Sequence, residues 1–167
     1  MKLANKISLI TGAGQGIGRA IALEFAKEGS FIIVNNLTLN KAISVSREIE
    51  ELGGKARPIE ADISSFNEAE EMVARIIDEF ERIDILVNNA GIQTEHPFLA
   101  LPLEDWDKIM DVNLKGTFIC SQLVAKHMVK RNAGKIINIA SIHYNIPRYR
   151  KIHYDVSKAG VAMLTRE

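Results

Sequence analysis

Residues 11–18, which read TGAGQGIG, decide the fold of this 167-residue chain. They stand between a short β-branched run at residues 6–11 and an amphipathic stretch at residues 16–27. Glycines at such a junction permit a tight turn, a close approach of the backbone to a pyrophosphate group and tight packing of helix on strand. The helix N-terminus adds free N–H groups and the positive end of its dipole. A glycine-rich turn alone also suits any junction that needs small residues, but its position after the first strand predicts a dinucleotide-binding turn.

The rest of the chain continues this alternation of short apolar runs and longer amphipathic stretches. Strands are predicted at residues 31–35, 55–60, 84–88 and 135–140. Helices are predicted at residues 39–52, from Ser65 or Asn67 to 81, at 104–130 and from His153 onward. Strands that are apolar on both faces and alternate with helices are typical of a covered parallel sheet, and right-handed crossovers wind it in both directions. We therefore predict one α/β domain over residues 1–167, a Rossmann-type doubly wound parallel sheet with helices on both faces.

Composition narrows the class of protein. Lys plus Arg and Asp plus Glu both number 21, so no global field favours a nucleic acid or an anionic membrane as partner. No apolar run approaches the roughly 20 residues of a membrane span, and residues 1–6 show no signal-peptide pattern. The single Cys120 excludes an internal disulfide and fits a reducing compartment, and the four histidines lack metal-ligand spacing. We expect a cytoplasmic protein without a metal site.

Further motifs follow the glycine turn in a fixed order. They are Asp62 after the third predicted strand, residues 88–91 (NNAG) after the fourth, Asn113 in the long helix, Ser141 after the fifth strand, and Tyr154 with Lys158 on the last helix. With the Gly-x-x-x-Gly-x-Gly spacing that begins at Gly12, this set resembles the classical short-chain dehydrogenase/reductase family over essentially the whole chain. The resemblance implies an oxidoreductase that moves a hydride between a nicotinamide cofactor and a secondary alcohol or carbonyl.

The chemistry of four residues suits that reaction. A free tyrosine titrates near pH 10 and is a poor base at neutrality, so a nearby cation has to favour its phenolate. Tyr154 and Lys158 are four residues apart on a predicted helix and share a face, which makes Tyr154 the expected general acid or base. Ser141 is expected to hydrogen-bond the substrate oxygen. The resemblance adds that Lys158 holds the nicotinamide ribose and that Asn113 supports a water relay to this lysine.

Each of these residues also has a simpler explanation. A Tyr/Lys pair at helical spacing is usually surface decoration, Ser141 suits a helix cap, and Asn113 suits a helix irregularity. Asn88 and Asn89 suit turn positions. The joint occurrence of all motifs in order favours the catalytic interpretation.

The residues expected to bind the cofactor come from the glycine turn, the ends of three strands and the catalytic pair. They are Gly12, Gln15, Gly16, Ile17, Gly18, Asn36, Asp62, Ile63, Asn89, Ala90, Gly91, Tyr154 and Lys158. The resemblance places Asp62 at the adenine. An acidic residue at the end of the second strand would favour NAD and a cation would favour NADP, but Asn36 is neither. Both cofactors stay open, with a slight preference for NAD because no cation for the extra phosphate is evident in the sequence.

The substrate is expected to be a small molecule. Residues 141–147 resemble the corresponding segment of bacterial sugar dehydrogenases of the glucose dehydrogenase kind, which implies a sugar or polyol. A 3-oxoacyl-acyl-carrier-protein reductase is the alternative, although such enzymes usually have a smaller, glycine-richer segment there. The basic residues Arg148, Arg150 and Lys151 directly precede the catalytic helix. They would favour an acidic substrate such as a sugar acid if they lie at the pocket mouth, or they form a solvated loop.

Two expectations concern assembly and extent. Apolar residues on the long helix and the catalytic helix (Phe118, Leu123, Val124, Val161 and Leu164) favour a homodimer or homotetramer through these helices. Members of the family continue beyond this point with further strands and a substrate-covering region, so we expect the domain to be incomplete at its C-terminus. An inactive dinucleotide-binding fragment is therefore the non-enzymatic alternative.

Overall fold

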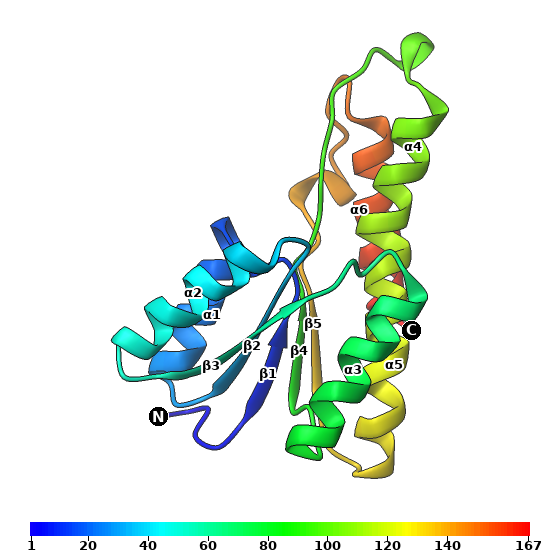
Figure 1. Cartoon of the computed structure of the whole chain (residues 1–167). Coiled ribbons are helices and arrows are strands. Elements are labelled where there is room, and N and C mark those ends of the chain that lie inside the picture. The colour runs from blue at the N-terminus through cyan, green and yellow to red at the C-terminus, as the bar shows by residue number, and fades with distance from the viewer.

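A computed structural model describes all of residues 1–167 and has five parallel strands in the order β3-β2-β1-β4-β5 (Figure 1). The strands are β1 (Ile7–Ile10), β2 (Phe31–Asn36), β3 (Lys55–Glu60), β4 (Ile85–Asn88) and β5 (Lys135–Asn138). The main helices are α1 (Gly16–Lys27), α2 (Leu39–Glu51), α3 (Phe66–Phe80), α4 (Leu103–Met110), α5 (Gly116–Lys130) and α6 (Ile152–Leu164). The predicted doubly wound α/β fold is confirmed, and the predicted bounds hold to within two residues.

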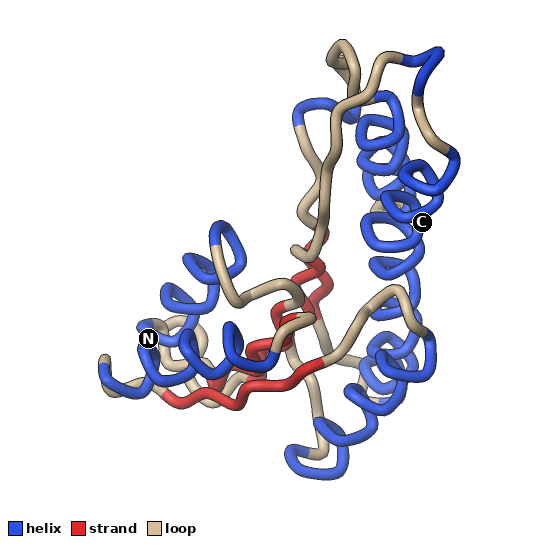
Figure 2. The backbone as a smooth tube through the Cα atoms, turned by 45° about the horizontal axis from the view of Figure 1, so that its top comes forward, coloured by secondary structure: helices blue, strands red, loops and turns tan.

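Helices cover both faces of the sheet, with α1 and α2 on one side and α3 and α5 on the other (Figures 1 and 2). Successive strand residues point to opposite faces, and two separate cores result. Leu9, Ile33 and Leu86 pack with α3 and α5, whereas Ile10, Val34, Val87 and other strand residues pack with α1 and α2. The near-continuous apolar strands in the sequence reflect this burial on both faces.

The long helix predicted over residues 104–130 is interrupted. A π-helical turn, η2 (Asp111–Lys115), joins α4 to α5 and carries the fully buried Asn113 at its centre. Wide turns of this kind often occur at functional sites, because the extra residue re-aims a side chain. None of the helices is both long and apolar enough to span a lipid bilayer.

Three of the apolar residues expected at an oligomer interface are not on the surface. Leu123, Val124 and Val161 are buried inside the chain, and the first two belong to the core that packs on the sheet with α3. Of the α5 residues named for this interface, Phe118 remains exposed.

One aspartate ties together the ends of three strands. Asp84 precedes β4; its side chain accepts the Ile7 N–H at 2.9 Å and an Arg131 N–H at 3.1 Å. Its N–H donates to the Ile7 carbonyl, and its carbonyl accepts the Lys135 N–H at 3.0 Å. Burial alone would raise the pKa of Asp84, but the Ile7 N–H, Arg131 and the charge of Arg82 hold this pKa below its ordinary value.

We expect Asp84→Asn to lower the free energy of unfolding at pH 7 by about 1 to 3 kcal/mol, since it removes charge-assisted hydrogen bonds at a mostly buried position. A group whose pKa is lowered on folding contributes stability above its unfolded pKa, near 3.9, and loses it as the pH falls through the folded value. Urea unfolding should therefore show a difference between the two proteins that is full at pH 7 and shrinks below about pH 4.

The exposed Asp78 on α3 provides the control, because Asp78→Asn should change the free energy of unfolding by less than about 0.5 kcal/mol. An Asp84→Asn difference of the same size at pH 2.5 and pH 7 would contradict this account of the carboxylate.

Candidate active site

A large cleft opens at the carboxyl ends of the strands, where the strand order reverses between β1 and β4. Ligands of open α/β sheets bind at this kind of position. The cleft has a volume of about 1270 Å³. Its walls include most of the residues expected to bind the cofactor, namely Gly12, Gln15, Gly16, Ile17, Asn36, Asp62, Ile63, Asn89, Ala90, Gly91, Tyr154 and Lys158. The structure therefore gathers these separate motifs into one site.

The glycine turn forms a cradle that is open beside Gly16. Gly12 and Gly16 have φ angles of +63° and +57°, which other residues rarely adopt. A Cβ at Gly12 would stand 2.7 Å from the Ala90 Cα, whereas a Cβ at Gly16 would meet nothing within 4 Å. The open side of Gly16 and the N-terminus of α1 fit the pyrophosphate of a dinucleotide. Gly18 does not line the cleft; it permits close packing instead, since a Cβ there would lie 2.6 Å from the Gly12 carbonyl oxygen.

Hydrogen bonds fix the glycine turn to the segment after β4. The Thr11 hydroxyl accepts the N–H groups of Asn89 at 3.0 Å and Ala90 at 3.1 Å. In return, the Asn89 side-chain amide donates to the carbonyls of Thr11 at 2.9 Å and Gly12 at 3.2 Å. Asn89 is thus a structural residue of the cleft as well as part of its wall.

Asn88 holds the neighbouring strand end in a similar way. Its amide donates to the Asn138 side chain at 2.8 Å and to the Ser121 hydroxyl at 2.9 Å, so β4, β5 and α5 are linked at the floor of the site. The sequence did not predict that Asn138 and Ser121 belong to the site. Each is a single polar residue outside any motif, and its contact with Asn88 becomes visible only in the folded structure.

A cation that was not expected from the sequence lies beside the end of β2. Lys41, in the first turn of α2, donates from its Nζ to the Gln15 side-chain oxygen at 2.9 Å and lines the cleft beside Asn36. The premise for a preference for NAD, that no cation is available here, was therefore wrong. Lys41 is five residues beyond Asn36 in the sequence, and only the β2–α2 turn brings the two side chains together. The sequence alone therefore did not indicate that Lys41 lies at this position.

The predicted catalytic pair lies together at the opposite end of the cleft. Tyr154 and Lys158 share one face of α6, and the Lys158 Nζ is 5.9 Å from the centre of the Tyr154 ring. This Nζ donates to the Ile139 carbonyl at 2.7 Å. Burial lowers the pKa of the Lys158 ammonium from its ordinary value.

Asn113 joins three parts of the site from inside the fold. Its side-chain oxygen accepts the Ile92 N–H at 2.8 Å, and its amide donates to the Ile92 carbonyl at 2.9 Å and the Ser157 hydroxyl at 3.1 Å. A Cβ at Gly91 would lie 3.3 Å from the Asn113 oxygen and 3.5 Å from the Lys158 Nζ. Asn113 therefore clamps the loop after β4 against the catalytic helix, close to the lysine. The interpretation of Asn113 as part of a helix irregularity is confirmed, and its support of a water relay stays a prediction.

Ser141 begins a short 3-10 helix, η3 (Ile142–Tyr144), and its hydroxyl accepts the His143 N–H at 3.2 Å. This is the capping role that was considered for Ser141. The hydroxyl proton stays free to donate, because the serine serves as acceptor in this contact. The His143 ring meets the Tyr154 ring edge-on, with 6.3 Å between their centres.

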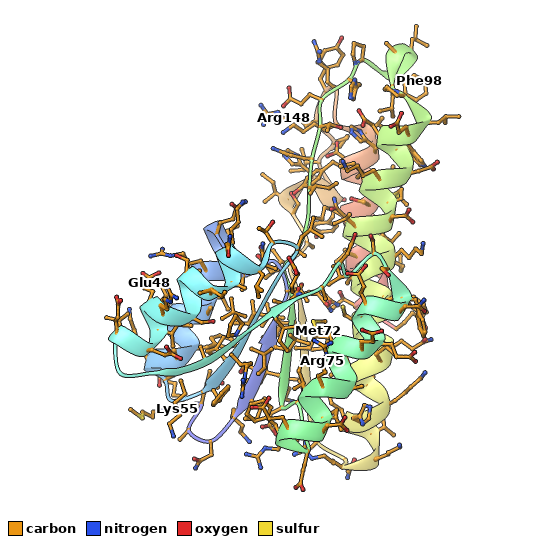
Figure 3. All side chains as sticks on the ribbon, viewed as in Figure 1. Glu48, Lys55, Met72, Arg75, Phe98 and Arg148 are labelled. Atoms are coloured by element: carbon orange, nitrogen blue, oxygen red, sulfur yellow. The ribbon has the colours of Figure 1, made fainter.

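A second hollow of about 450 Å³ adjoins this region, and its walls include His96, Phe98, His143, Arg148 and Arg150. Figure 3 shows Phe98 and Arg148 at the upper end of the molecule. Arg148 and Arg150 are exposed, whereas Lys151 is buried and bonds Gln93 at 2.9 Å and Glu95 at 3.2 Å. The basic cluster is thus divided into two accessible arginines and one structural lysine.

Two histidines of this region have side-chain partners, and the cysteine is buried. His96 pairs with Asp105, and the fully buried His153 bonds the Thr94 hydroxyl at 2.7 Å. Burial raises the pKa of the Cys120 thiol to about 12, so it stays protonated. No three His, Cys, Asp or Glu side chains are grouped so that they can hold a metal ion.

Comparison with known proteins shows the family. The short chain dehydrogenase model matches residues 6–167. A 3-oxoacyl-acyl-carrier-protein reductase from Thermotoga maritima is 37% identical over 166 residues, which cover 99% of this chain and 68% of that protein. A 5-keto-D-gluconate 5-reductase from Escherichia coli is 40% identical over 164 residues, which cover 98% of this chain and 65% of that protein.

A solved structure agrees with these relatives. The gluconate 5-dehydrogenase from Burkholderia cenocepacia, in complex with NADP and tartrate, matches with a TM-score of 0.95 and 37% identity, over 99% of this chain and 65% of that one. The chain spans about two thirds of the length of the proteins it matches. It belongs to the short-chain dehydrogenase family, whose members are NAD(P)-dependent oxidoreductases.

Proposed function

We propose that this protein interconverts a secondary alcohol and a carbonyl on a sugar or polyol, using a nicotinamide dinucleotide. The observation that carries the proposal is the position of Tyr154 and Lys158 in the same cleft as the open glycine cradle. A proton-transfer group and a phosphate-binding turn in one cleft fit a redox reaction that uses a dinucleotide.

Reduction of a carbonyl adds a hydride to carbon and a proton to oxygen. When bound, the reduced nicotinamide supplies the hydride. Tyr154 donates its hydroxyl proton to the substrate oxygen and is left as a phenolate, and the free hydroxyl proton of Ser141 hydrogen-bonds the same oxygen as charge develops. In the oxidation direction, the Tyr154 phenolate takes the proton back.

Lys158 supports the phenolate from the neighbouring helical turn. Its Nζ, 5.9 Å from the centre of the Tyr154 ring, provides a positive charge beside the phenolate that proton transfer leaves. The Ile139 carbonyl accepts a hydrogen bond from the Lys158 ammonium and holds it in place. Because burial lowers the pKa of this ammonium, Lys158 donates a proton to the phenolate more readily. Asn113 positions this end of the site through Ile92 and Ser157.

Tyr154→Phe tests this assignment, because it removes the proton and keeps the ring. We expect kcat to fall by about 10²- to 10⁴-fold while the Kd for NADPH, measured by fluorescence titration, changes less than about threefold. The unchanged Kd for NADPH is the internal control, because the other two tyrosines, Tyr144 and Tyr149, line the second hollow. Equal activity of wild type and Tyr154→Phe would contradict the mechanism, and nucleotide binding without any turnover by wild type would favour the inactive alternative.

The substrate class within this reaction is proposed as an acidic sugar or polyol. Arg148 and Arg150 are exposed at a hollow that adjoins Tyr154 through His143, and guanidinium groups bind carboxylates in a bidentate manner. The relatives named for 5-keto-D-gluconate and gluconate support this class. The 3-oxoacyl thioester is the second candidate, because the relative from Thermotoga maritima is named for it.

A substrate panel separates these classes. We expect kcat/KM to be higher for keto-sugar acids than for neutral keto sugars and for a 3-oxoacyl thioester. The double change of Arg148 and Arg150 to Ser should lower kcat/KM for the acids by about tenfold or more and leave the neutral sugars unchanged. An unchanged preference in the double variant would refute the role of the arginines, and a preference for the thioester in wild type would favour the second candidate.

A homodimer or homotetramer through α5 and α6 is also proposed. Exposed apolar residues on these helices support it, notably Phe118 and Val129 on α5 and Val156 and Met163 on α6. Light scattering should give a mass at least twice that of one chain, and Phe118→Glu should lower it by placing a charge in the apolar surface. A monomer at concentrations of tens of micromolar would contradict the proposed assembly.

A further inference from the structure

The geometry points to Lys41 as the residue that recognises the 2′-phosphate of NADP, and we infer that this protein prefers the phosphorylated dinucleotide. The inference deepens the proposed function and rests on it, because it assumes that a dinucleotide occupies the cleft. It concerns the end of the cleft beside β2, away from Tyr154 and the substrate.

The adenosine ribose of a dinucleotide lies at the end of the second strand of this fold, about 20 residues beyond the glycine turn. Asn36 is the last residue of β2 and occupies that position. Its side-chain amide donates to the Thr38 carbonyl at 3.2 Å, which turns it toward the β2–α2 connection. An acidic side chain here would repel a 2′-phosphate, but Asn36 carries no charge.

Three elements meet around this position. A Cβ at Gly14 would stand 2.7 Å from the Lys41 Cβ and 2.8 Å from the Asn36 Cγ, so the glycine turn, β2 and the first turn of α2 are in direct contact. The Lys41 Nζ reaches the Gln15 side chain at 2.9 Å. The Lys41 ammonium therefore lies close to the glycine turn, which fits the pyrophosphate, and to Asn36, the position expected beside the ribose.

The charges around Lys41 leave it available for an anion. Its partner Gln15 is neutral, and no carboxylate lies within 4 Å of its ammonium. Of the nearby acids, Glu60 accepts the Leu39 N–H at 3.0 Å and does not line the cleft, and Asp62 accepts the N–H and the hydroxyl of Ser64. Arg19 does not compete for the phosphate, because its guanidinium is paired with Glu48.

A lysine ammonium binds phosphate as a point charge. Lys41 has three N–H donors and uses one on Gln15, so two stay free for phosphate oxygens. A 2′-hydroxyl offers no charge to this ammonium. The preference for NADP over NAD therefore depends on this one side chain, which places the selectivity on α2 instead of on the last residue of β2.

The test uses 2′,5′-ADP and 5′-AMP, which carry the adenosine half of the cofactor with and without the 2′-phosphate, in isothermal titration calorimetry with the full-length protein. We expect wild type to bind 2′,5′-ADP about 10- to 100-fold more tightly than 5′-AMP, the range of a charge-assisted hydrogen bond. Lys41→Met should remove most of this difference and leave 5′-AMP binding within about twofold, and Lys41→Arg should restore it. Neither measurement depends on turnover or on the substrate half of the site.

Arg47→Met is the matched control, because it removes the same charge from an exposed position of α2 outside the cleft. It should leave the binding of both nucleotides unchanged. Equal affinities of wild type for the two nucleotides, or an equal loss of both in Lys41→Met, would overturn the inference and leave the dinucleotide site intact. A wild-type protein that binds neither nucleotide would overturn the proposed function as well.

Discussion

The site depends on the contact between the turn after β1 and the segment after β4. Thr11 is fully buried, and its hydroxyl accepts two backbone N–H groups from Asn89 and Ala90, while the Asn89 amide returns two hydrogen bonds to the turn. Buried polar groups are costly unless they are all paired, so this reciprocal set fixes how the two segments approach. The approach is so close that the residue facing Ala90 has to be Gly12. The glycine cradle and the segment after β4 are therefore positioned as one unit.

The residues at both ends of the cleft are attached to the two segments that this contact joins. On one side, the Asn88 amide links β4 to β5 and α5, and Asn113 at the π-helical turn ties Ile92 to the catalytic helix. On the other side, the turn meets Asn36 and Lys41. In the proposed mechanism, proton transfer and cofactor selection would thus be carried by separate elements that share this connection.

The sequence predicted the fold well, because strands buried on both faces leave apolar runs and the glycine turn marks their first junction. It also predicted which motifs meet, since parallel strands end at one edge of the sheet. It could not supply contacts that depend on the exact path of the chain. Lys41 reaches the cleft through the β2–α2 turn, and Asn113 is aimed by a π-helical turn that periodicity does not reveal. Leu123, Val124 and Val161 suited an interface and the core equally well, and burial settled them in the core.

A crystal structure of the protein soaked with NADPH would test the central claim most directly. The account requires the pyrophosphate on the backbone N–H groups of the glycine turn near Gly16, and the nicotinamide ribose within hydrogen-bonding distance of Tyr154 and Lys158. It would be contradicted by a dinucleotide bound elsewhere, such as the hollow beside Arg148, or by one in the cleft with its nicotinamide end turned away from Tyr154.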